Sequence, residues 1–191
     1  MGHPARFLGL VLLAACCALA TEERDPIVVN GENACGQVWV NLSLTGLRLD
    51  ETYVPMVIAV YNRAKGQATV TRDSFRLIGA DGREVHVPGV KELRQAYDKL
   101  TMDRRMVSTA GIPFGTWLRR SRTVPSNFFP GMGSSGGGTT IDHVSMPPMF
   151  GMVDLVYFER PKGLALGQPV VLEVKPEGWE ESIRLQIRVK P

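Results

Sequence analysis

Hydrophobic and polar residues alternate along much of this chain, in the pattern of half-buried β-strands. In segment 183–189, four aliphatic residues alternate with Arg184, Gln186 and Arg188. The same two-residue period runs through 38–44 and 84–87. Because successive side chains of a strand point to opposite faces, each segment predicts a strand with one buried face.

Other strands are predicted by apolar runs between turns. Segment 53–62 (YVPMVIAVYN) is apolar on both faces and predicts a central strand, with Pro55 near its start, where a missing N–H is tolerated. Asp-Gly within 80–83 is a strong hairpin signal. About seven or eight strands predict a mainly β fold, an antiparallel β-sandwich. Further strands are expected at 68–71, 75–78, 152–159 and 170–174.

A long insertion, residues 88–148, interrupts the strand pattern. Val90, Leu93, Tyr97 and Leu100 recur at helical spacing and predict a short amphipathic helix, with a second helical piece at 103–108. Residues 130–140 (PGMGSSGGGTT) predict a glycine-rich loop. Insertions of this length between strands are typical of functional loops or of disordered segments.

The N-terminus carries the pattern of a secretory signal. Arg6 precedes an apolar run, 7–15, that is too short to cross a bilayer. Leu13-Ala14-Ala15-Cys16 resembles the bacterial lipobox, in which the cysteine thiol is lipidated. The resemblance implies cleavage after residue 15, a lipid anchor on Cys16, and an envelope lipoprotein that faces the periplasm or the exterior.

A second cleavage site leaves an alternative open. Ala18-Leu19-Ala20 fits ordinary signal peptidase, and cleavage after residue 20 would give a soluble periplasmic or secreted protein. On the lipoprotein interpretation, residues 16–36 are a tether and first strand, and 37–191 form the sandwich. Cys35 is then either a buried apolar residue or a disulfide partner of Cys17.

The strand sequences also resemble a known class of domain. VIAVYN followed by SFRLIGADGREV is similar to the Ig-like domains of bacterial envelope lipoproteins of unknown function, and DLVYFERPKGL is similar to their penultimate hairpin. The resemblance implies an Ig-like sandwich with a binding, scaffolding or assembly role, and it brings no catalytic residues. The matching residues are Val60, Asn62, Phe75, Leu77, Asp81 and Gly82.

Composition and charge narrow the classes of partner. The 191 residues are 44% hydrophobic and 21% charged, which allows one domain with a core. Three cysteines cannot build a disulfide framework. A net charge of +3 is too small to indicate a nucleic-acid binder. The predicted partners are a membrane, through the lipid anchor, and a protein or an envelope polymer.

The insertion concentrates arginine and aromatic residues, a combination that can bind anionic head groups, polyanionic glycans or a partner protein. This arginine/aromatic set is the predicted binding surface, and the alternative is a solvated loop whose aromatic residues cap the core. Its members are Arg104, Arg105, Trp117, Arg119, Arg120, Arg122, Phe128 and Phe129.

A second candidate site is a cluster of His143, Met146, Met149 and Met152. Imidazole and thioether ligands suit Cu(I), so a copper-handling protein is the alternative function. However, Pro147-Pro148 favours an extended backbone, in which residues three apart do not share a face. Methionine packing in the core is the competing interpretation.

Catalytic motifs are missing from the sequence. It contains no serine nucleophile elbow, no H-E-x-x-H, no C-x-x-C, and no lysine after its glycine-rich run. We therefore expect a non-catalytic protein without a cofactor, and an unrecognised hydrolase is the third hypothesis.

Overall fold

The computed structural model describes residues 28–85, 87–109, 122–130, 139–162, 164–165 and 167–188. Within these residues the chain is mainly β, and all strand pairs but one are antiparallel. The five-stranded sheet has the order β1 (Val28–Glu32), β2 (Gly36–Asn41), β3 (Tyr53–Asn62), β9 (Phe150–Glu159) and β7 (Arg122–Thr123). The four-stranded sheet has the order β11 (Ile183–Arg188), β10 (Pro169–Val174), β5 (Phe75–Ile78) and β6 (Glu84–Val85), and β4 (Ala68–Thr71) pairs with β8 (His143–Met146).

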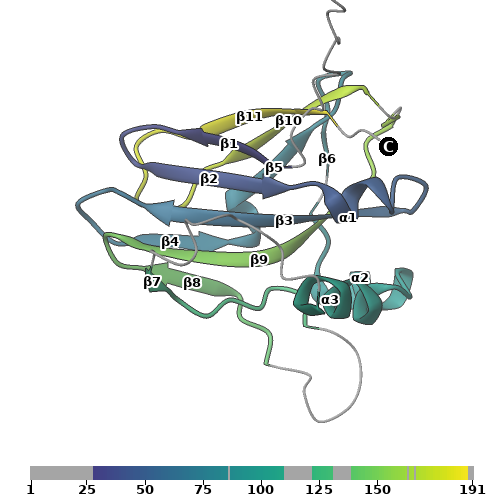
Figure 1. The fold of residues 1–191 in the computed structure, drawn as a ribbon, viewed down its shortest axis with the longest axis horizontal. Helices are drawn as coiled ribbons and strands as arrows, with labels where there is room; N and C mark the ends of the chain where they lie inside the picture. Colours follow the sequence, from purple (N-terminus) through teal and green to yellow (C-terminus); the bar gives the residue numbers. More distant parts are fainter. Residues whose placement is uncertain are drawn as a thin grey trace, which may run out of the picture.

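Three α-helices and a short 3-10 helix (Arg72–Ser74) accompany the sheets in the described part of the chain. α1 (Ser43–Gly46) follows β2, while α2 (Val90–Ala96) and α3 (Leu100–Thr109) belong to the insertion. Figure 1 shows α2 and α3 together beside the end of the five-stranded sheet where β3 begins and β9 ends. The predicted helix at 90–100 is wrong in its length, because the chain leaves helical geometry at Tyr97, whose φ and ψ are −136° and 110°.

The paired strands β3 and β9 form the centre of the five-stranded sheet. β3 is buried along nine of its ten residues, as its two-sided apolar sequence predicts. It pairs with β2 on one side and with β9 on the other, where the register runs from Tyr53 opposite Glu159 to Tyr61 opposite Gly151. Figure 1 shows these two long strands crossing the middle of the molecule.

The two larger sheets approach each other closely on the β1–β11 side. A Cβ added to Gly31 in β1 would lie 2.5 Å from Cδ2 of Leu185 in β11. Trp179, in the turn before β11, is buried and donates from Nε1 to Oδ1 of Asn62 at the end of β3 (3.2 Å). Side chains from both sheets therefore belong to one hydrophobic core.

Two sequence predictions are corrected beside β2 and β8. The strand predicted over 38–44 ends at Asn41, because its Oδ1 accepts the Ser43 N–H (2.9 Å) and turns the chain into α1. Residues 143–146, which the sequence analysis placed in the insertion outside the strand pattern, form the strand β8 opposite β4. Among the described residues, none of the helices has the length and apolar character needed to cross a bilayer.

We expect Gly36→Ala to destabilise the fold strongly. A Cβ at Gly36 would lie 2.3 Å from the Tyr61 carbonyl oxygen, a backbone atom that cannot rotate away. Overpacking of this kind lowers the free energy of unfolding by about 1–3 kcal/mol. Gly66→Ala is the matched control, because nothing lies within 4 Å of its added Cβ. Urea unfolding followed by tryptophan fluorescence measures both, and equal stabilities would contradict the prediction.

Candidate functional site

Residues 122–126 of the insertion run along the edge of β9 that faces away from β3. Arg122 and Thr123 pair with Phe150 and Gly151, and Val124 donates to the Gly151 carbonyl (2.8 Å). Further along, Ser126 Oγ donates to the Val153 carbonyl (2.6 Å). An unpaired strand edge is open to pairing with other chains, so this segment also protects the sheet.

A buried carboxylate, Asp103 on α3, joins the insertion to the rest of the domain. Its side chain has no exposed area and forms an ion pair with Arg48, whose Nη2 lies 2.9 Å from Oδ1. The Tyr97 hydroxyl donates to Oδ2 (2.6 Å), and the Tyr157 hydroxyl also reaches Oδ2 (3.3 Å). One carboxylate thus connects α3 to the α2–α3 junction, to β9 and to the loop after α1.

The tyrosines around Asp103 are packed edge to face. The ring centroids of Tyr97 and Tyr157 are 5.4 Å apart, and those of Tyr53 and Tyr97 are 6.2 Å apart. Burial raises the pKa of Tyr97 and of Tyr157 far above the usual value, and the negative charge of Asp103 raises each further. Both hydroxyls therefore stay protonated at neutral pH and serve as hydrogen-bond donors.

A second buried carboxylate, Asp154, interrupts the apolar sequence of β9. Its Oδ1 accepts from Arg104 Nη2 (3.0 Å) and from the Leu155 N–H (2.8 Å), and Oδ2 accepts from the Phe128 N–H (2.7 Å). Arg104 Nε also donates to the Phe129 carbonyl (2.6 Å). Because Arg104 follows Asp103 on α3, neighbouring residues of one helix make the two buried ion pairs.

Phe128 and Phe129 do not belong to an exposed binding surface, which corrects the sequence prediction. Both side chains have no exposed area. Phe128 packs edge to face on Phe75 of β5, with centroids 6.2 Å apart, and Phe129 packs on Tyr157 of β9 at 5.4 Å. They fill the core between the two sheets, as in the alternative in which aromatic residues cap it.

The other members of the predicted binding set differ in their surroundings. Arg104 forms an ion pair with Asp154, whereas Arg105 is exposed on α3. Arg122 is exposed on β7, with its Cζ 5.8 Å from the centre of the Phe150 ring. The remaining members of the set, Trp117, Arg119 and Arg120, lie outside the described residues. The predicted lipidation site, Cys16, also lies outside them.

The four residues of the predicted copper site are not brought together. His143 is exposed on β8, and Met146 points to its opposite, buried face. Met146 and Met152 have no exposed area, while Met149 is 61% exposed. Within the described part of the chain, no group of three or more histidine, cysteine or acidic residues is placed to hold a metal ion.

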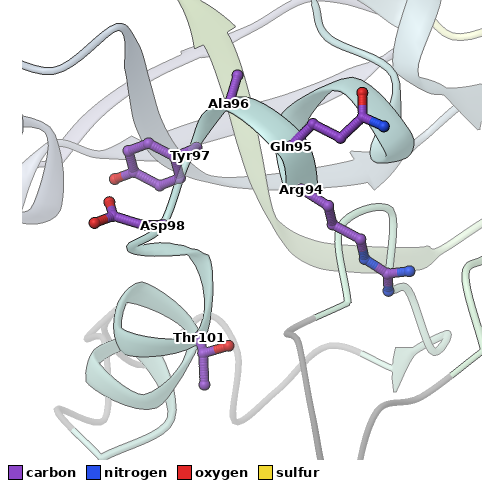
Figure 2. Close-up of a pocket in the computed structure, with 6 residues that line it drawn as sticks. All are labelled: Arg94, Gln95, Ala96, Tyr97, Asp98 and Thr101. Carbon is purple, nitrogen blue, oxygen red and sulfur yellow. The ribbon is translucent and has the colours of Figure 1, made fainter.

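A shallow pocket of about 330 Å³ lies at the α2–α3 junction. Figure 2 shows that the Arg94 side chain extends away from those of Tyr97 and Asp98, so the charged groups do not converge on one point. The pocket therefore offers a surface for contact. It is lined by Arg94, Gln95, Ala96, Tyr97, Asp98 and Thr101.

Sequence reasoning missed the two buried carboxylates. Asp103 stands three residues after Leu100, where the apolar stripe of the predicted helix would continue. Asp154 is the one charged residue within the apolar run 150–158. A charged residue at a position that the pattern assigns to the core is the signal that could have identified both, since buried charges need partners.

Comparisons with known protein families, with curated proteins and with solved structures find no match to this chain.

We expect Asp103→Ala to lower the free energy of unfolding by about 3–5 kcal/mol, because it leaves Arg48 as an uncompensated, nearly buried charge. Glu84→Ala is the control. It removes an ion pair with Arg76 in which both side chains are more than half exposed, and such pairs contribute about 1 kcal/mol or less. Chemical denaturation compares the variants, and similar effects of the two substitutions would show that Asp103 does not hold the insertion.

Proposed function

We propose that this chain is a bacterial envelope lipoprotein, anchored to a membrane through Cys16, and that its folded domain is a non-catalytic binding or assembly module. The lipobox-like residues 13–16 support the anchor. A thioether-linked diacylglycerol with an added acyl chain would bury enough methylene groups, at about 0.8 kcal/mol each, to hold the protein on the bilayer.

The domain is proposed to be an Ig-like β-sandwich. Support comes from a five-stranded and a four-stranded sheet that contribute to one core. Further support comes from the long strand that ends at Asn62 and from the Asp-Gly turn before β6, two features on which the sequence resemblance to envelope lipoprotein domains rests.

The binding role rests on the way the insertion is attached. Asp103 and Asp154 fix α3 and residues 128–129 to the sheet through buried ion pairs. A rigidly mounted element loses little conformational entropy on binding, which favours recognition. The α2–α3 side, with Arg94, Gln95 and Arg105 exposed, is the proposed contact surface for a protein or an envelope polymer.

We expect the wild-type chain to fractionate with membranes and to carry the mass of an acylated N-terminus. Cys16→Ser removes the thiol that accepts the lipid, so this variant moves to the soluble fraction without acyl mass. Cys17→Ser is the matched control and retains the anchor. Fractionation and intact-mass spectrometry measure the result. Membrane retention of Cys16→Ser at an unchanged mass would contradict the lipoprotein proposal.

We expect a photo-crosslinking residue at Gln95, exposed at the α2–α3 pocket, to give a discrete cross-linked product in native membranes. The control position is Gln186, exposed on β11 in the other sheet. Placement at single positions is needed because deletion of the insertion would remove Phe128 and Phe129 from the core. Identical products from both positions, or none from Gln95, would overturn the proposed contact surface.

A further inference from the structure

The pocket at the α2–α3 junction is polar and carries no net charge. Four of its six lining residues have exposed side chains that can form hydrogen bonds, and these are Arg94, Gln95, Asp98 and Thr101. The charge of Arg94 is balanced by that of Asp98. In the described part of the chain, neither the Gln95 amide nor the Asp98 carboxylate is bonded to another residue. Both groups can therefore bind a ligand without first breaking an internal contact.

Between these polar groups the pocket has a small apolar surface. Figure 2 shows Ala96 between Gln95 and Tyr97 where α2 ends, and the Ala96 methyl group is exposed. Tyr97 also lines the pocket, and its hydroxyl is already donated to Asp103 (2.6 Å). The lining thus places hydrogen-bonding groups beside exposed carbon atoms. A sugar ring carries the same combination in its hydroxyl and C–H groups.

The common ways of recognising a peptide do not fit this pocket. An extended peptide needs an open sheet edge, a peptide helix needs an apolar groove, and a phosphorylated or acidic segment needs a cluster of arginines. Here the lining comes from the end of α2 and the start of α3, with one arginine and one carboxylate that extend apart (Figure 2). An uncharged polymer rich in hydroxyl groups requires none of the missing features, so it is favoured over a peptide.

The backbone around the pocket is held in place by contacts outside it. On α2, the Glu92 carboxylate accepts from the Tyr53 hydroxyl at the start of β3 (2.9 Å). Between the two helices, Lys99 forms an ion pair with Glu51 in the loop after α1. Because these contacts fix the junction before any ligand binds, binding loses little conformational entropy in the protein. Such a site can use individually weak hydrogen bonds to hydroxyl groups.

We propose that the α2–α3 pocket binds a neutral saccharide segment of an envelope polymer. The Asp98 carboxylate accepts hydrogen bonds from sugar hydroxyl groups, and the Gln95 amide can both donate and accept. Arg94 donates to the Pro130 carbonyl (3.4 Å) and keeps further N–H groups for the ligand. The volume of about 330 Å³ lies at the small end of ligand pockets and fits a short segment of a chain. This proposal rests on the contact surface proposed above and names its ligand.

Calorimetric titration tests the class of ligand on the full-length chain carrying Cys16→Ser, so that no detergent is needed. The neutral probes are maltohexaose, cellohexaose and chitohexaose, and the charged probes are hexaglutamate and hexalysine. We expect at least one neutral saccharide to bind, and both charged peptides to bind more weakly. Asp98→Ala removes a charged acceptor and should weaken saccharide binding about tenfold, and Gln95→Ala should weaken it about threefold.

Two exposed residues outside the pocket provide matched controls, Asp50→Ala for the lost charge and Gln186→Ala for the lost amide. Since all four side chains are exposed, urea unfolding should find each variant as stable as the parent chain. Absence of binding by all three saccharides, tighter binding of a charged peptide, or unchanged saccharide binding by both pocket variants would overturn the proposal.

Cross-linking at Gln95 separates this proposal from the one on which it rests. A protein attached at Gln95 would retain the contact surface and overturn its saccharide ligand. A product whose added mass resists protease and is released by acid hydrolysis of glycosidic bonds is the result expected for a saccharide.

Discussion

The fold depends on burying two carboxylates together with their arginine partners. Asp103 has no exposed area, and an isolated charge in such a place would be prohibitively unfavourable. Arg48 and the hydroxyls of Tyr97 and Tyr157 compensate it, and these three groups come from three separate parts of the chain. The ion pair therefore forms only when α3, β9 and the loop after α1 are all in place, which couples the insertion to the sheet.

The same constraint explains why the insertion is not an independent appendage. Asp154 binds Arg104 and the Phe128 N–H, so α3 and residues 128–129 are held against β9, and the two phenylalanines enter the core. The arginine that the sequence offers for binding is thereby used for structure. The exposed side of α2 and α3 is the proposed contact surface, and the buried side of these helices holds it in position.

A second polar hub, Asn62, organises the opposite end of β3. It bonds to the β3–β4 turn, to β8 and to Trp179, and its carbonyl accepts the N–H of Met149, which has a φ of 65° in the turn between β8 and β9. Strain at one exposed residue is tolerated because the surrounding bonds fix the backbone. Buried polar groups therefore fix the backbone at both ends of the central sheet, Asp103 at one end and Asn62 at the other.

The sequence by itself determined the bounds of β3, β4 and β5, because alternation and apolar runs report directly on burial. The insertion was also visible in the sequence, and the lipid anchor is a prediction from residues 13–16 alone. Only the tertiary structure decided which side of the insertion is buried. Phe128 and Arg104 look like surface residues in a polar segment, yet their partners Phe75 and Asp154 are distant in sequence. Local patterns carry no information about partners brought together by folding.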